Sequence, residues 1–217
     1  DQRILKQSTV GAWARWPDFE CVASMLPDRF PGMIFHVGHC GSTLISRLIE
    51  AATGSQGLRE PLILRSLASE WEDAGSGDSA FGRDQLQIRL DLFLRSIARD
   101  SGRAVVKASS MCGDLALTHL ALRDSSRSAF IYVRPGIYVA TMLGGENNRT
   151  DLYGFAKLRR RRLARRGIET PPLSDLAPGE IASLCWLAEA CSFAAASAAE
   201  YQRILKSDFD VFMDRPE

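Results

Sequence analysis

The chain has 217 residues, of which 46% are hydrophobic and 24% are charged, and its formal net charge is +1. This length and composition fit a globular domain with a hydrophobic core and exclude a disordered chain. The small net charge argues against a dedicated nucleic-acid-binding protein, which must neutralise many phosphates.

Short segments of β type alternate with longer helical segments along the chain. We expect strands at residues 33–37, 57–59, 104–107, 129–133 and 203–206. We expect helices at residues 42–52, 61–71, 85–100, 114–122, 137–143, 152–166 and 180–201. The alternation favours an α/β fold with a mainly parallel sheet. We interpret residues 1–217 as one domain, and we expect a piece to be missing at one or both ends.

Two polar segments interrupt this pattern. Residues 144–151 are polar and rich in glycine, which predicts a mobile loop. Residues 158–166 read LRRRRLARR, and a run of like charges usually forms a solvated helix face. We therefore expect these arginines to face water.

The cysteines indicate a reducing environment. There are five, an odd number, and none forms a Cys-x-x-Cys pair, so neither a disulfide framework nor a zinc site is indicated. Reduced thiols predict a cytoplasmic location. No apolar run approaches the roughly 20 residues that cross a bilayer, so we expect no membrane span.

Residues 35–51, FHVGHCGSTLISRLIEA, have the composition of a strand, a tight turn and an amphipathic helix. Unpaired N–H groups at a helix N-terminus attract anions, and small residues in the turn let an anion approach them. Gly38, Gly41, Ser42 and Thr43 meet that need. The simpler interpretation is a strand-to-helix turn capped by Ser42.

Three anion-binding chemistries compete for this turn. A nucleoside triphosphate-binding loop requires a Gly-Lys pair that is absent here. A cysteine phosphatase requires an arginine after five intervening residues, whereas six residues separate Cys40 from Arg47. One extra helical residue rotates a side chain by about 100°, so Arg47 would point away. The third chemistry is the binding of a phosphosulfate.

Residues 33–47, MIFHVGHCGSTLISR, resemble the P-[KR]-S-G-T-T-L pattern of the sulfotransferases that use 3′-phosphoadenosine 5′-phosphosulfate (PAPS). Further segments resemble motifs of this family in the same order. They are LREP at 58–61, VVK at 105–107, FIYVRPGIYVAT at 130–141 and RILKSDFDVFMDRPE at 203–217.

The resemblance implies a sulfotransferase of the P-loop-containing nucleotide hydrolase-like fold, a three-layer α/β/α sandwich. It implies transfer of a sulfuryl group from PAPS to a hydroxyl or amine, without a metal. The implied PAPS-binding residues are His39, Cys40, Gly41, Ser42 and Thr43 at the 5′-phosphosulfate, and Arg134 and Thr141 at the 3′-phosphate. The implied catalytic residues are Glu60 as general base, and Lys107 and His39, which offset charge on the departing phosphate.

Two alternatives remain open. His39 stands where the family carries Lys or Arg, which allows a nucleotide-binding module without catalysis. A P-loop kinase-like phosphotransferase is the other alternative. The sequence does not identify the acceptor, which can be a small molecule, a glycan or a peptide, and it leaves the oligomeric state open. We expect residues 72–84 and 144–151 to form the acceptor pocket.

Overall fold

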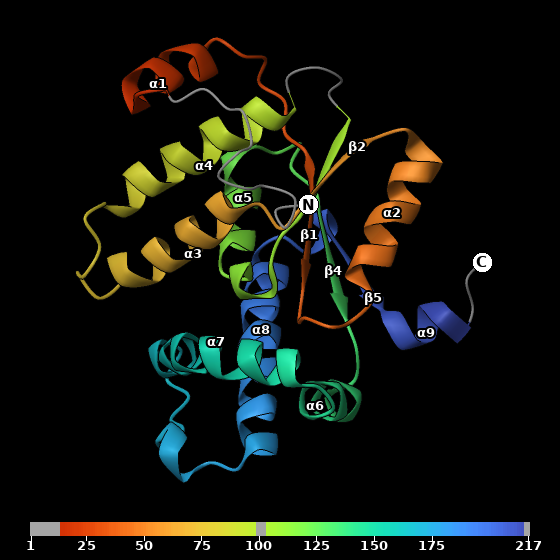
Figure 1. Cartoon of the computed structure of the whole chain (residues 1–217). Coiled ribbons are helices and arrows are strands. Elements are labelled where there is room, and N and C mark those ends of the chain that lie inside the picture. The colour runs from red at the N-terminus through yellow and green to blue at the C-terminus, as the bar shows by residue number, and fades with distance from the viewer. Residues whose placement is uncertain (1–13, 99–102, 215–217) are drawn as a thin grey trace.

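The computed structural model describes residues 14–98 and 103–214. One sheet contains five parallel strands in the order β2-β3-β1-β4-β5 (Figure 1). The strands are β1 (Gly32–His36), β2 (Gln56–Arg59), β3 (Ala104–Lys107), β4 (Ser128–Tyr132) and β5 (Ile204–Asp208). They confirm the predicted parallel sheet, with bounds within two residues of the expected ones.

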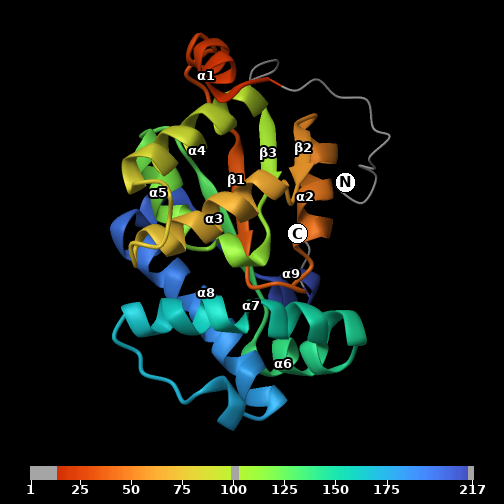
Figure 2. The same ribbon diagram turned by 60° about the vertical axis from the view of Figure 1, so that its left-hand side comes forward.

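Helices cover both faces of this sheet. They are α1 (Trp16–Ser24), α2 (Ser42–Thr53), α3 (Leu62–Ala74), α4 (Arg83–Ile97), α5 (Leu115–Leu122), α6 (Pro135–Leu143), α7 (Glu146–Arg165), α8 (Pro178–Ala199) and α9 (Phe209–Asp214). Helix α2 lies on one face, and α3, α4, α5 and α8 lie on the other (Figures 1 and 2). The result is the three-layer α/β/α arrangement that the sequence predicts. The end of the predicted helix 85–100 lies outside the described residues.

β1 is the central strand of the sheet, and it is buried between the helices on both faces. Its residues Met33, Ile34, Phe35 and His36 are all at most 5% exposed, as expected for a parallel strand with helices on both faces. Because β3 and β4 flank β1 on its two sides, the segments that follow these strands meet at one edge of the sheet. Helices α6 and α7 cross below that edge (Figure 1).

The prediction of a mobile loop at residues 144–151 is wrong, because α7 begins at Glu146. Polar side chains in this first part of α7 bond the carbonyl groups that end α6. Asn148 Nδ2 donates to Thr141 O at 2.8 Å, and Arg149 Nη2 donates to Leu143 O at 3.0 Å. Thr141 O also accepts from the N–H of Gly144 at 3.2 Å, so the polar side chains of α7 add to the cap of α6 and connect the two helices rather than form a loop.

The prediction of a solvated arginine face at 158–166 is also wrong at its centre. Arg159 is 2% exposed and Arg162 is 0% exposed. Arg162 donates to Glu72 Oε1 on α3 and to Glu189 Oε1 on α8, each at 3.1 Å. Helix α7 packs against α8, so these side chains meet carboxylates instead of water.

Helix α8 is long and apolar enough to cross a membrane, contrary to the expectation from the sequence. Half of this stretch is buried inside the fold, and Glu189 near its middle forms ion pairs with Arg159 and Arg162. We therefore interpret α8 as a core helix. Its many alanines raise the hydropathy and also allow α6 and α7 to pack closely against it.

Candidate functional site

The segment between β1 and α2 is a tight turn that leaves the start of α2 open. Its backbone is left-handed at Gly38 (φ 98°), His39 (φ 48°) and Gly41 (φ 70°). Gly41 is the N-cap of α2, and no described side chain caps the helix there. The first N–H groups of α2 are therefore available to an anion, as the sequence predicts.

His36 holds this turn in place from the end of β1. The N–H of Gly38 donates to His36 Nδ1 at 3.0 Å, which leaves Nε2 to donate to Ala108 O at 2.8 Å. Burial, reinforced by the positive charge of Lys107, lowers the pKa of His36 to about 3. His36 is thus a neutral structural residue, and the sequence analysis assigned it no role.

Glu60 and Lys107 form an ion pair at the ends of β2 and β3. The Lys107 side chain is 4% exposed and that of Glu60 is 41% exposed, so the pair lies between the core and the solvent. The N–H of Glu60 also donates to Lys107 O at 2.7 Å. Burial alone would raise the pKa of Glu60, but the hydrogen bond and charge of Lys107 outweigh it and hold that pKa below its usual value. Glu60 is therefore a carboxylate at neutral pH.

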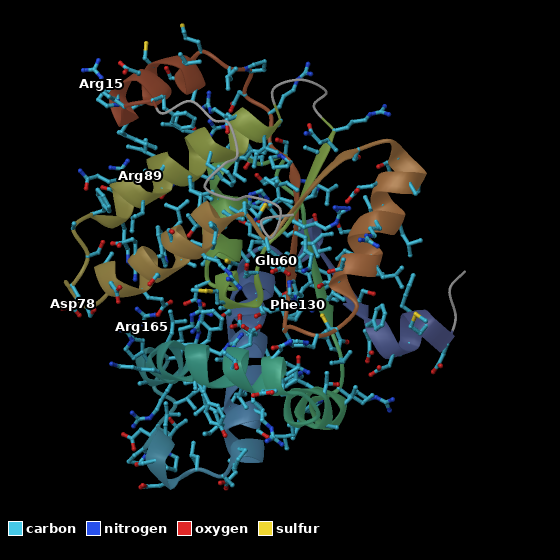
Figure 3. The ribbon with its side chains drawn as sticks, viewed as in Figure 1. Arg15, Glu60, Asp78, Arg89, Phe130 and Arg165 are labelled. Atoms are coloured by element: carbon cyan, nitrogen blue, oxygen red, sulfur yellow. The ribbon has the colours of Figure 1, made fainter. Side chains whose placement is uncertain are left out.

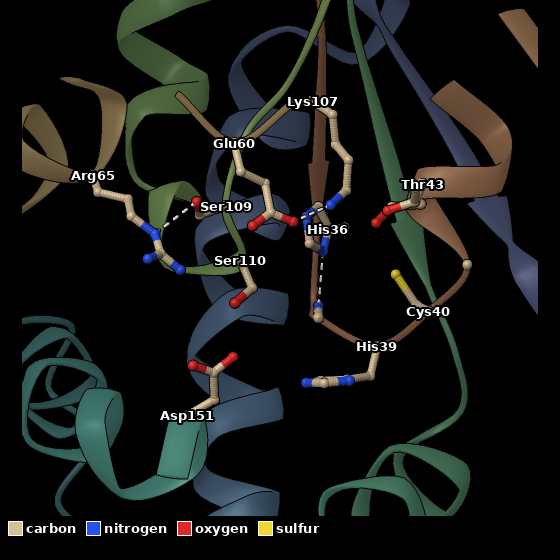
Figure 4. Close-up of a pocket in the computed structure, with 13 residues that line it drawn as sticks. His36, His39, Cys40, Thr43, Glu60, Arg65, Lys107, Ser109, Ser110 and Asp151 are labelled. Atoms are coloured by element: carbon tan, nitrogen blue, oxygen red, sulfur yellow. Dashed lines mark hydrogen bonds and ion pairs between the residues drawn. The ribbon is translucent and has the colours of Figure 1, made fainter. Parts of the chain in front are cut away.

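Five residues with no predicted role complete the cleft, which has a volume of about 220 Å³ (Figure 4). They are His36, Arg65, Ser109, Ser110 and Asp151. The two serines come after β3, separated from it only by Ala108, so the sequence could have placed them at the carboxyl edge of the sheet. Arg65 and Asp151 come from α3 and α7, whose positions over the cleft the sequence did not reveal.

The structure brings most of the predicted site residues together. The predicted residues that line the cleft are Gly38, His39, Cys40, Gly41, Ser42, Thr43, Glu60 and Lys107. Arg134 and Thr141 are not among its lining residues. Arg134 precedes α6 and its Nε contacts Asp210 Oδ2 at 3.4 Å, while Thr141 Oγ1 donates to Ile137 O at 2.9 Å. Both follow β4, the strand beside β1.

The thiol of Cys40 is unsuited to nucleophilic attack. Cys40 is 1% exposed, and its Sγ donates to Ile131 O at 3.3 Å. Burial raises its pKa to about 11, so the group is a neutral thiol at neutral pH. The geometry thus agrees with the rejection of a cysteine phosphatase.

Gly41 is required by a close contact as well as by its backbone. A Cβ at this position would lie 2.1 Å from the ring of Phe209, which belongs to α9. The aromatic ring therefore packs directly against the turn. Among residues 14–98 and 103–214, no group of three or more His, Cys, Asp or Glu residues could hold a metal ion.

Comparison with known proteins defines the class of fold. No protein-family model matches the sequence, and no curated protein matches it. The sulfotransferase domain from the curacin biosynthetic pathway matches with a TM-score of 0.50 and 15% identity, over 87% of this chain and 70% of that chain. An uncharacterized protein from Eubacterium ventriosum ATCC 27560 matches with a TM-score of 0.33 and 12% identity, over 86% of this chain and 94% of that one. The chain has a sulfotransferase-like three-layer α/β/α fold.

Proposed function

We propose that the protein transfers a sulfuryl group from PAPS to a hydroxyl or amine acceptor. The observation that carries this proposal is the cleft itself. It combines the open N-terminus of α2 with a buried cation, Lys107, and a partly exposed carboxylate, Glu60. An anion-binding helix end, a cation and a base within one cleft are the groups that transfer of an anionic group requires.

The cleft suits the charged end of the donor. The hydroxyls of Ser42 and Thr43 and the first N–H groups of α2 are hydrogen-bond donors for the 5′-phosphosulfate. Lys107 and Arg65 supply positive charge. The volume of about 220 Å³ is below the roughly 300–1,000 Å³ of typical ligand pockets, so the nucleoside would extend beyond the cleft.

The remainder of the donor is proposed to lie toward the end of β4. Arg134 is 69% exposed, and its contact with Asp210 at 3.4 Å is long for an ion pair. A 3′-phosphate can therefore displace Asp210 from this guanidinium, and the hydroxyl of Thr141 is a further donor once it leaves Ile137 O. His39 is exposed on the turn and is proposed to add positive charge near the bridging oxygen.

The chain's own groups would act as follows. The bound donor supplies the sulfuryl group. Glu60 accepts the proton of the acceptor hydroxyl or amine, which makes the acceptor nucleophilic. Lys107 lies against Glu60 in the free protein and would turn part of its charge toward the donor anion. The ion pair between Lys107 and Glu60 then weakens, which makes the Glu60 carboxylate a stronger base.

The first test is ligand-dependent thermal stability. A ligand that binds only the native state raises the melting temperature. We expect 3′-phosphoadenosine 5′-phosphate to raise it, and ATP with Mg²⁺ to have no effect. Stabilisation by ATP with Mg²⁺ alone would instead favour a kinase-like phosphotransferase.

The second test measures transfer of ³⁵S-labelled sulfate to panels of alcohols, phenols, amines and glycans. We expect Glu60→Gln to retain binding of 3′-phosphoadenosine 5′-phosphate and to lose transfer by about 10²–10⁴-fold, the usual contribution of a general base. Glu169→Gln is the matched control, because Glu169 is exposed in the segment after α7 and is not among the residues that line the cleft. Full activity of Glu60→Gln would disprove the assigned role.

A nucleotide-binding module without catalysis is the second candidate. It is favoured by His39, which stands where the resembled family carries Lys or Arg. Nucleotide binding without turnover on any acceptor would support it. We also propose a cytoplasmic location, because all five cysteines are free thiols.

A further inference from the structure

A second cavity, of about 440 Å³, lies near the C-terminal ends of α3 and α7, whose N-terminal parts line the cleft. The cleft is lined by Arg65, early in α3, and Asp151, early in α7. The second cavity is lined by Trp71 and Arg165, close to the C-terminal ends of the same helices. Figure 3 shows Arg165 at the end of α7, well separated from Glu60.

Three arginines converge on this cavity from two helix ends. Arg83 lies at the start of α4, and Arg165 and Arg166 end α7. Trp71 forms part of the wall, and Arg83 stacks over its ring with 5.0 Å between the guanidinium carbon and the ring centroid. The hydroxyl of Ser192 is a further polar group on the wall.

Buried groups hold two of these guanidinium groups in position. Arg165 pairs with Glu72, which is 2% exposed. Arg166 Nη2 lies 2.5 Å from Asp114 Oδ1 and donates to Ser192 Oγ at 3.2 Å. The Arg165 and Arg166 side chains remain 34% and 26% exposed, so each retains surface for a ligand. Because these ion pairs already fix both guanidinium groups, a ligand would not have to order them on binding, which favours affinity.

The cavity and the buried network behind it carry an excess of positive charge. The cationic members are Arg83, Arg159, Arg162, Arg165 and Arg166, and the acidic members are Glu72, Asp114 and Glu189. In the described part of the chain, Arg83 has no carboxylate within ion-pair distance. Burial raises the pKa of Glu72 to about 7, so its negative charge is incomplete at neutral pH.

We propose that this second cavity binds an oxyanion, the phosphate or sulfate group of a small ligand, between Arg83 and Arg165. Arginine suits this task because its planar guanidinium donates two parallel hydrogen bonds to such a group. A bound anion would also offset the excess charge of the buried network. The proposal does not depend on sulfuryl transfer in the cleft.

The test follows the indole N–H resonance of Trp71 by NMR during titration with inorganic pyrophosphate and, separately, with sulfate. The Trp71→Phe variant assigns this resonance. We expect a saturable shift, weakened by about tenfold or more in Arg83→Gln, because one charge-assisted contact is lost. Arg83 is exposed, so its replacement should leave the fold intact. Comparison of the two titrations shows which oxyanion the cavity prefers.

Two controls make the test specific. Arg89→Gln removes another arginine of α4 that stacks on an aromatic ring, Trp16, and should leave the titration unchanged. Arg65→Gln removes a positive charge from the cleft and should also leave the Trp71 response unchanged. The proposal is overturned if Trp71 shows no saturable shift, if Arg83→Gln binds as tightly as the unmodified chain, or if Arg65→Gln abolishes the shift.

Discussion

Arg159 donates a hydrogen bond from Nη2 to the hydroxyl of Ser110 at 3.1 Å. Ser110 lines the cleft, and its Cβ would lie 3.3 Å from a Cβ built on Gly38. The neighbouring Ser109 hydroxyl accepts a hydrogen bond of 2.9 Å from Arg65 Nε. Two serines after β3 are thus each fixed by an arginine from a different helix, and the buried part of α7 supports one wall of the cleft.

The buried ion pairs of α7 predict that two neighbouring arginines differ in how much they stabilise the fold. Arg162→Met removes one of the two arginine partners of each buried carboxylate, Glu72 and Glu189, and should lower the free energy of unfolding by about 3 kcal/mol. Urea denaturation measures this change. The matched control is Arg161→Gln, whose partner is Asp73 at 3.2 Å and whose side chain is 46% exposed. It should cost at most about 1 kcal/mol. Equal losses would contradict the burial of Arg162.

The unequal burial of Glu60 and Lys107 predicts that replacing either one lowers the free energy of unfolding by a different amount. Glu60→Gln leaves the ammonium group of Lys107 buried without its carboxylate and should cost about 3 kcal/mol of unfolding free energy. Lys107→Met leaves a carboxylate that can reach water, so it should cost clearly less. The double variant should recover part of the loss of Glu60→Gln. Denaturation curves of the three variants measure the cycle, and a larger loss in Lys107→Met than in Glu60→Gln would refute the assigned burial.

The two glycines that flank α2 predict different tolerance to a methyl group. Both are left-handed, with φ of 70° at Gly41 and 65° at Gly54. In Gly54→Ala the new Cβ has no atom within 4 Å, so only backbone strain should lower the free energy of unfolding, by about 1–2 kcal/mol. Gly41→Ala must also displace the ring of Phe209 and should cost more. Thermal denaturation compares them, and equal melting temperatures would show that the ring moves freely.

His36 predicts a loss of stability in acid. Its pKa is about 3 in the folded protein, against about 6.5 for an unperturbed histidine. Between these values the unfolded chain binds a proton that the folded protein does not. Stability from this group is therefore complete above pH 6.5, and falls by about 1.4 kcal/mol per pH unit as the pH drops toward 3.

The His36→Gln variant isolates this effect, because an amide can accept from Gly38 and donate to Ala108 without titrating. The nearby Lys107 and Glu60 stay in place, and so does Glu72, whose raised pKa makes the opposite contribution. We expect the stability of the variant to depend less steeply on pH between about 6 and 4. Parallel curves for the two proteins would rule out the neutral buried state of His36.

The sequence predicted the strands and the tight turn between β1 and α2 well, because their signals are local. The apolar residues of β1 are followed at once by Gly38 and Gly41, which permit the left-handed turn. Helix α7 shows where local signals fail. Its arginines look solvated by charge alone, and only the packing of α3 and α8 against α7 brings Glu72 and Glu189 to them.

The order of residues by itself determined the parallel α/β fold and the turn before α2, because each depends on strand periodicity and on residues next to a strand end. Only the tertiary structure placed β2 beside β3, so that Glu60 meets Lys107. The tertiary structure alone decided that His36 is a neutral support, that Arg65 and Asp151 reach the cleft, and that α7 buries its charges. These properties depend on which distant helices pack together, and a side chain's solvation and pKa follow from that packing rather than from its neighbours in the chain.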